Sequence, residues 1–310
     1  MFYKGKSKLQ ENYYIDNHTH GSYGINFNYT TYEEVKNLLK KLFKRNIRGI
    51  CPTLTGETNF NIIKQLALFK KIREEQLKSQ ENEALILGVH LEGTFLSPKK
   101  SGIQDRKTFK KPTIENFKDL VGDFEDIIKI VTIAPEEDFD LICYLNDKNI
   151  KTQAGHTVGT TLKKCAATTH HFNAMNPIHH RNSSIALEGL VNDDVYCEII
   201  GDLIHCSKDI LKLVFKCKPK DKILLISDSL PSSHYDKDIV FCGKKITKEG
   251  KDKNGTLAGS NKTLDEICKK LIRENILTKE DIEKMAFLNQ IKYLNLKDRE
   301  IDILNQQKIC

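Results

Sequence analysis

The sequence lacks the segments that place a protein in a membrane or direct it to secretion. No stretch approaches 18 consecutive apolar residues, and the opening residues MFYKGKSKLQ hold no apolar signal-peptide core. The nine cysteines are an odd number and form no CxxC pair. Such cysteines are typical of free thiols in a reducing compartment rather than of a disulfide framework. We therefore expect a cytoplasmic protein.

A strong charge and low-complexity segments are also missing. The 49 Lys and Arg residues exceed the 42 Asp and Glu residues by only seven in a chain of 310 residues. This mild charge gives little reason to expect nucleic-acid binding. The hydrophobic content of 39% is enough for a sizeable core. The length fits one large α/β domain or two smaller ones.

Eight short β-rich runs alternate with longer mixed stretches. The runs cover residues 13–20, 48–54, 85–93, 128–136, 151–157, 167–173, 196–202 and 222–229. Several are apolar along most of their length, for example LILGVHLEG and KILLISDS. An unbroken apolar run is expected when both faces of a strand are buried, as in a parallel sheet.

Helical patterns fill the gaps between the runs. An apolar stripe at helical spacing predicts a helix over 31–45, and 59–75, 207–217, 261–274 and 278–294 read similarly. Ser207 is the predicted N-cap of its helix. Alternating strands and helices predict an α/β fold, a (β/α)8 barrel formed by residues 1–310 as a single domain. A doubly wound open sheet is the alternative, although no GxGxxG follows an early strand.

Candidate metal ligands stand near the carboxyl ends of the predicted strands, which form the active-site face of such a barrel. His18 and His20 end the first strand as HxH, so both side chains can point the same way. Glu92 ends an apolar strand, where a carboxylate is costly unless it is paired or metal-bound. Together with His156 and His170 it would suit Zn²⁺ or Fe²⁺. Hydrogen-bonded structural histidines and a buried salt bridge are the alternatives.

Three other positions suggest chemistry at the same face. Asp228 follows four apolar residues in LLISDS and is placed to act as a general base, or to cap the next segment. Arg181 follows two histidines in a loop, where a guanidinium suits phosphate or carboxylate recognition, unless it is simply a solvated surface residue. The glycines of GTLAGS, residues 255–260, allow close approach to a ligand or form an ordinary turn.

These motifs together resemble a known family. YIDNHTHG, GVHLEGTFLSPKKSG, AGHT, THHFNAMNPIHHR, ISDSLP and NGTLAGSNKTLDE occur in family order across residues 14–266. The chain is similar to the N-acetylglucosamine-6-phosphate deacetylase family of the amidohydrolase superfamily. The resemblance implies a hydrolase that uses a divalent metal to cleave a linear amide bond in amino-sugar metabolism.

The resemblance also assigns roles to individual residues. It implies that Glu92, His156 and His170 hold a Zn²⁺ or Fe²⁺ ion, and that Asp228 is catalytic. His18 and His20 match positions that bind a second metal in some family members. The implied substrate-binding residues are Asn173, Ala174, Arg181, His205, Leu257, Ala258 and Gly259. In the family the arginine usually comes from the partner subunit, so a homodimer is expected.

The chain departs from the family pattern at several points. Gln104 stands where a histidine usually polarises the substrate carbonyl, and glutamine can donate a hydrogen bond but cannot carry a proton. ISDSLPSS replaces the usual segment around Asp228. The small β-sandwich domain of the family is expected to be absent or vestigial. Two alternatives stay open: a deacetylase of another sugar phosphate, such as N-acetylgalactosamine 6-phosphate, or a non-catalytic barrel that binds amino-sugar phosphates.

Overall fold

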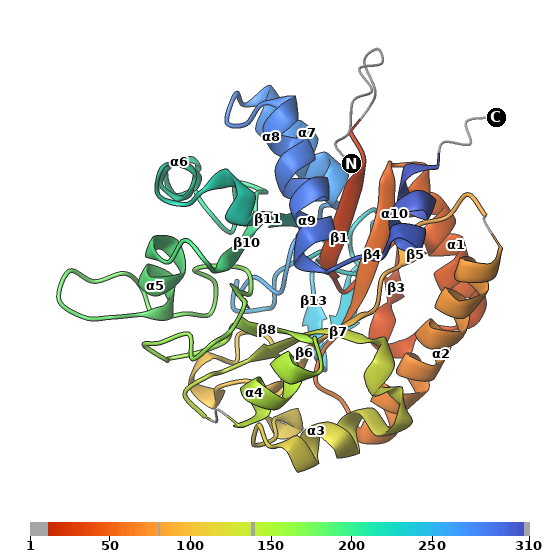
Figure 1. The fold of residues 1–310 in the computed structure, drawn as a ribbon, viewed down its shortest axis with the longest axis horizontal. Helices are drawn as coiled ribbons and strands as arrows, with labels where there is room; N and C mark the ends of the chain where they lie inside the picture. Colours follow the sequence, from red (N-terminus) through yellow and green to blue (C-terminus); the bar gives the residue numbers. More distant parts are fainter. Residues whose placement is uncertain (1–11, 80, 138–139, 307–310) are drawn as a thin grey trace.

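The computed structural model describes residues 12–79, 81–137 and 140–306 and contains a barrel of parallel strands (Figure 1). The strands follow one another in chain order around the barrel. They are β1 (Tyr14–Thr19), β4 (Ile47–Leu54), β6 (Val89–Phe95), β7 (Ile128–Ile133), β8 (Lys151–Ala154), β9 (Ala167–Thr168), β10 (Tyr196–Ile200) and β11 (Ile223–Ile226). A parallel bridge between Thr19 and Ser229 joins the last strand to the first. The eight predicted strands and the barrel are confirmed, and the open-sheet alternative is wrong.

The helices surround this barrel on its outer side (Figure 1). They are α1 (Tyr32–Phe43), α2 (Asn59–Lys78), α3 (Ile114–Val121), α4 (Asp140–Asp147), α5 (Ile185–Val191), α6 (Lys208–Cys217), α7 (Leu264–Arg273), α8 (Lys279–Glu283), α9 (Asn289–Tyr293) and α10 (Asp298–Asn305). Ser207 accepts a hydrogen bond from the backbone N–H of Ile210, which confirms the predicted N-cap. A π-helical turn at Lys284–Leu288 interrupts the helix predicted over 278–294. Among the described helices, none has the length and apolarity that a membrane crossing requires.

One predicted strand is broken in two. The run 85–93 forms β5 (Leu85–Ile86) and then β6, with Gly88 between them. Gly88 has a φ of +140°, which side-chain-bearing residues rarely adopt, and a Cβ there would lie 2.8 Å from the Cβ of Lys129. The glycine therefore lets the chain turn from the base of the barrel into β6.

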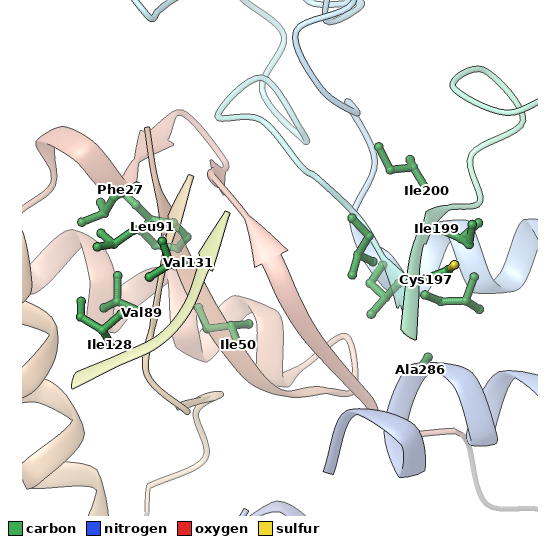
Figure 2. Close-up of a cluster of buried hydrophobic side chains, with 14 of the residues drawn as sticks. Phe27, Ile50, Val89, Leu91, Ile128, Val131, Cys197, Ile199, Ile200 and Ala286 are labelled. Carbon is green, nitrogen blue, oxygen red and sulfur yellow. The ribbon is translucent and has the colours of Figure 1, made fainter. Parts of the chain in front are cut away.

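The two larger of the three apolar clusters among the described residues are separated by the strands. Outward-facing residues such as Val89, Val131, Cys197 and Ile199 pack with the surrounding helices in the larger cluster (Figure 2). A smaller cluster includes the strand residues Ile15, Cys51, Ile130, Ala167 and Leu224, together with Phe287, Tyr293, Leu294 and Leu304 from the last helical segments. This second cluster packs strand residues against the C-terminal helices, and we call it the apolar plug.

Short elements complete the described fold. Two small hairpins form, β2 (Gly21–Ser22) with β3 (Ile25–Asn26), and β12 (Ile239–Phe241) with β13 (Lys244–Ile246). Short 3-10 helices cover Phe27–Tyr29, Pro98–Lys100, Arg106–Thr108, Gly122–Ile127 and Lys220–Lys222. The aromatic ring of Phe241, on the second hairpin, packs against that of His20 with centroids 5.1 Å apart. The expectations of a single domain and of a missing β-sandwich stay predictions.

Candidate active site

Glu92 lies at the centre of a cluster of histidines that come from different strands. Its Oε1 atom is 3.1 Å from Nε2 of His156 and 2.9 Å from Nε2 of His170. Its Oε2 atom is 3.3 Å from Nε2 of His20 and 3.8 Å from Nε2 of His18. All five residues are buried. Within the described residues no lysine or arginine pairs with Glu92, and its ion-pair contacts are with these four histidines.

Backbone hydrogen bonds determine which ring nitrogen of His156 and of His20 carries the hydrogen. Nδ1 of His156 is 2.7 Å from the carbonyl oxygen of Lys100, and Nδ1 of His20 is 3.2 Å from that of Thr53. Because a carbonyl oxygen only accepts, Nδ1 carries the hydrogen in each ring. In the neutral imidazole the lone pair on Nε2 therefore points at the carboxylate.

The donor set fits a divalent cation. Two nitrogens, Nε2 of His156 and of His170, lie 3.1 Å apart and face the same carboxylate oxygen. Nε2 of His18 is buried and has no hydrogen-bond partner. Lone pairs and carboxylate oxygens that converge in this way repel unless a cation lies between them. Nitrogen and carboxylate ligands in this number suit Zn²⁺ or Fe²⁺.

The electrostatics of the cluster lead to the same conclusion. Burial alone would raise the pKa of Glu92, but the close contacts with the surrounding histidines hold it well below its usual value. Burial would lower the pKa of His18, but the carboxylates of Asp228, Glu198 and Glu92 raise it well above the ordinary value. The buried carboxylates thus stabilise positive charge at this position, whether it comes from protons or from a metal ion.

Asp228 stands opposite Glu92 across the histidine pair. Its Oδ1 atom is 3.3 Å from Nε2 of His20 and 3.4 Å from Nε2 of His18. Burial would raise the pKa of Asp228, but the two histidines lower it, so the carboxylate is ionised at neutral pH. The residues that follow form turns rather than a helix, so the alternative of a helix cap is wrong.

Three site residues have a backbone conformation that no sequence pattern predicts. His156, His170 and Asp228 have φ values of +47°, +30° and +51°. Non-glycine residues rarely adopt positive φ, and such strained positions concentrate at functional sites. The run 167–173, predicted as one strand, ends at Thr168, so His170 lies in the turn that follows.

A cavity of about 560 Å³ opens above the cluster. It is lined by most of the substrate-binding residues that the resemblance implied, namely Gln104, Asn173, Ala174, His205, Leu257, Ala258 and Gly259. Gln104 is buried, and its Nε2 donates to Oε2 of Glu92 at 3.0 Å. Nδ1 of His205 lies 2.8 Å from Oδ2 of Asp202. Its remaining nitrogen, Nε2, is thereby left for a ligand.

Arg181 does not join this cavity. It is exposed in the loop before α5, as are His179 and His180, and it does not line the cavity of its own chain. The predicted role of Arg181 therefore depends on a second subunit and stays a prediction. The chain itself brings three other basic side chains to the cavity, Lys99, Lys100 and Arg106. No sequence pattern singled these residues out, although only two residues separate PKK from the strand that ends in HLEGTF.

Two other strand-end histidines have structural roles. Nδ1 of His90 is 3.2 Å from the carbonyl oxygen of Asn17, and its Nε2 is 2.8 Å from the hydroxyl of Thr132. His171 is buried, and its Nδ1 lies 2.9 Å from the hydroxyl of Thr168. Burial, with the nearby charge of Lys218, lowers the pKa of His171 to about 3. Both rings are therefore neutral parts of the core.

Glu198 is a buried residue of the site that sequence analysis missed. Its Oε2 atom is 3.1 Å from Nδ1 of His18, on the side of the ring that faces away from Glu92. The signal was present, because Glu198 is a single carboxylate in the apolar run YCEII. The reasoning that singled out Glu92 applies equally to it.

A parallel (β/α)8 barrel with histidines and carboxylates gathered at the carboxyl ends of its strands is the architecture of the amidohydrolase superfamily. No family model matches the chain. The chain is 31% identical over 303 residues to the N-acetylglucosamine-6-phosphate deacetylase of Bacillus subtilis, an alignment that covers 92% of this chain and 75% of the relative. The chain therefore belongs to the N-acetylglucosamine-6-phosphate deacetylase family.

Other known proteins agree with this assignment. The crystal structure of N-acetylglucosamine-6-phosphate deacetylase from Thermotoga maritima superposes with a TM-score of 0.83 at 26% identity, over 93% of this chain and 80% of that chain. The N-acetylgalactosamine-6-phosphate deacetylase of Escherichia coli is 25% identical, over 91% of this chain and 77% of that relative. The resemblance read from the sequence motifs is confirmed.

Proposed function

We propose that this chain hydrolyses the acetamide of N-acetylglucosamine 6-phosphate to glucosamine 6-phosphate and acetate. The observation that carries the proposal is the convergence of Glu92, His156 and His170 beside Asp228 at the floor of the cavity, in a chain of this family. The ligands that would hold a divalent cation and the group that would move protons lie together there. The cavity above them is large enough for a sugar phosphate.

Glu92, His156 and His170 would hold the first cation, and His18 and His20 are the candidates for a second. A divalent cation such as Zn²⁺ or Fe²⁺ lowers the pKa of water and polarises a carbonyl group. Gln104 can donate a hydrogen bond from the amide that now faces Glu92, and it is the residue placed to support the substrate carbonyl.

Asp228 would move the proton. Because its carboxylate is ionised, it can accept a proton from the attacking water while the water oxygen bonds to the acetamide carbon. The same proton then goes to the amide nitrogen as the C–N bond breaks, which yields the amine and acetate. One proton and one acyl group are thus transferred, and Asp228 returns to its starting state.

The phosphate would bind at the basic part of the cavity. His205 contributes a partly buried ring whose pKa is raised, because Asp202 outweighs the effect of burial. Lys100 lies beside the loop of Asn173 and Ala174, since its Nζ donates to the carbonyl oxygen of Met175 at 2.9 Å. A phosphate dianion is complementary to these cationic groups.

We extend the proposal to a homodimer and to the cytoplasm. Arg181 would reach the phosphate only in the cavity of a neighbouring subunit, because it is exposed and lies outside its own. The eight described cysteines are free, which suits a reducing compartment. Cross-linking with gradient sedimentation measures the oligomer directly.

The test of the function is a deacetylation assay on a panel of substrates. The panel holds N-acetylglucosamine 6-phosphate, N-acetylgalactosamine 6-phosphate and unphosphorylated N-acetylglucosamine. We expect release of acetate with the highest kcat/KM for the first. A higher value for the galactosamine derivative would reassign the substrate. No turnover of any member, in a metal-loaded preparation that binds the sugar phosphates, would establish a binding protein instead.

A further inference from the structure

Glu198, on β10, is a buried carboxylate that the mechanism above does not use. Its Oε2 atom lies 3.1 Å from Nδ1 of His18 and accepts a hydrogen bond from the backbone N–H of His170 at 3.3 Å. Its Oε1 atom accepts from Nε2 of Gln153 at 2.7 Å. The side chain is fully buried. Glu198 therefore contacts two candidate ligands that lie far apart in the sequence.

The contact with Glu198 determines the tautomer of His18. A carboxylate only accepts hydrogen bonds, so Nδ1 of His18 carries a hydrogen, and in the neutral ring that can bind a cation Nε2 carries the lone pair. That Nε2 atom is 3.4 Å from Asp228, 3.8 Å from Glu92, and without a hydrogen-bond partner. His20 has the same arrangement through the carbonyl oxygen of Thr53. Two lone pairs thus face Oε2 of Glu92, the oxygen that does not contact His156 or His170 and that accepts a hydrogen bond from Nε2 of Gln104.

We propose that Glu198 is a positioning residue that prepares His18 to hold a second cation together with His20 and Glu92. The inference rests on the proposed metal centre and assigns a role to Glu198, which contacts the His18 ring from behind. A carboxylate behind a ligating histidine fixes the ring and makes its free nitrogen a better ligand.

A competing cation site does not fit the same atoms. His18, His90 and Glu198 also lie close together. However, both ring nitrogens of His90 already have partners, the carbonyl oxygen of Asn17 and the hydroxyl of Thr132. Both oxygens of Glu198 likewise accept hydrogen bonds. The cation site therefore lies on the Glu92 side of His18, and Glu198 acts from behind.

The experiment compares cation binding by wild type, Glu198→Gln and Glu198→Asp. Zn²⁺ content per chain is measured by mass spectrometry after loading, and the affinity of each equivalent by calorimetric titration. We expect two equivalents in wild type. In both variants the affinity for the second should fall about 10- to 100-fold, the range for loss of such a supporting group. The affinity for the first should change no more than about threefold.

Two controls separate positioning from general damage to the barrel. Tyr293→Phe removes the hydroxyl that accepts from Gln153 at 3.1 Å, in the same buried network, and should leave both affinities unchanged. In a His18→Ala background, Glu198→Gln should produce no further loss of the second equivalent, because its effect passes through His18. The histidine ¹⁵N shifts of the Zn²⁺-loaded wild type should show the hydrogen of His18 on Nδ1, a measurement that needs no variant.

Several results would overturn the proposal. These are a single Zn²⁺ equivalent in wild type, wild-type affinity for the second equivalent in both Glu198 variants, equal loss of both equivalents, or a hydrogen on Nε2 of His18 in the Zn²⁺-loaded protein. The assignment of function is tested separately by acetate release. A chain that binds two equivalents but releases no acetate would refute the deacetylase and leave the role of Glu198 standing.

Discussion

The two ends of the barrel interior are built from opposite kinds of side chain. The apolar plug buries Ile15, Ile130 and Leu224 with helical residues such as Phe287. Farther along the same strands, the interior buries His18 and Thr132 instead. Burying a large aliphatic or aromatic side chain stabilises a fold by about 1.5–3 kcal/mol, whereas a buried carboxylate or imidazole costs free energy unless it is paired.

This difference shows how one set of strands can serve two purposes. The apolar plug supplies stability and leaves the other end free to hold converging carboxylates and strained backbone. Asp228, for example, is buried and has a positive φ, yet it belongs to no apolar cluster. We therefore expect substitutions at the plug to change stability with little effect on turnover. Substitutions at the active site should change turnover with little effect on stability.

The largest effect is expected at Asp228. Asp228→Asn keeps the shape of the side chain, and asparagine tolerates the positive φ at this position. An amide cannot take the proton of the attacking water, so kcat should fall about 10²- to 10⁴-fold. Steady-state kinetics and Zn²⁺ content measure the two properties together, and Zn²⁺ content should stay unchanged. Asp236→Asn, an exposed carboxylate paired with Lys248, is the matched control. Near-normal turnover in Asp228→Asn would refute the proposed mechanism.

The converse substitution lies in the apolar plug. Leu224→Ala removes a fully buried side chain from β11 and should lower the free energy of unfolding by about 2–5 kcal/mol. The value of kcat per folded molecule should stay within about twofold, because the active site is built from the other end of the strands. Denaturant unfolding and kinetics check both values. Leu213→Ala, at a side chain with 40% exposure on α6, should cost no more than about 0.5 kcal/mol. A large fall in kcat would show that the two ends are coupled.

Much of this division could be predicted from the sequence. The short β-rich runs located all eight strands, and several of them are apolar along most of their length because strands buried on both faces leave an unbroken hydrophobic signal. Glu92 stood out for the complementary reason, as a carboxylate at the end of such a run. The spacing of His18 and His20 placed both rings on one side of the first strand, and in the structure both face Glu92.

Other parts of the site depend on tertiary structure. The positive φ values of His156 and His170 arise where strands end beneath the cavity, and no local sequence pattern predicts them. Arg181 was expected at the phosphate, but it is exposed in the loop before α5 and does not line the cavity of its own chain, which its neighbours in sequence do not reveal. Glu198 carried a local signal, yet its role follows only from its contact with His18, which is 180 residues away.

A smaller effect is expected at the rim of the active site. Arg181→Ala should raise KM for the phosphorylated sugar about tenfold and leave the unphosphorylated sugar little changed, since a charge-assisted hydrogen bond contributes about 1.5–3 kcal/mol. Arg273→Ala, an exposed arginine on α7, is the control. Mixing Arg181→Ala with Asp228→Asn subunits should restore part of the activity, because one mixed site keeps both residues. If KM rises equally for both sugars, Arg181 has a structural role.

The smallest effect concerns the pH dependence of phosphate binding. Asp202 raises the pKa of His205 despite burial, so the ring keeps its positive charge to a higher pH than an ordinary histidine. The cationic form strengthens phosphate binding below that pKa and is lost as the pH rises through it. KM for the phosphorylated sugar should therefore rise on the alkaline side. In Asp202→Asn the pKa returns toward its usual value, and the rise should begin at lower pH. The unphosphorylated sugar serves as the control, because its KM should not follow this titration in either protein. An unshifted profile in Asp202→Asn would show that His205 does not bind the phosphate as a cation, and that the lysines and Arg106 carry this part of the site.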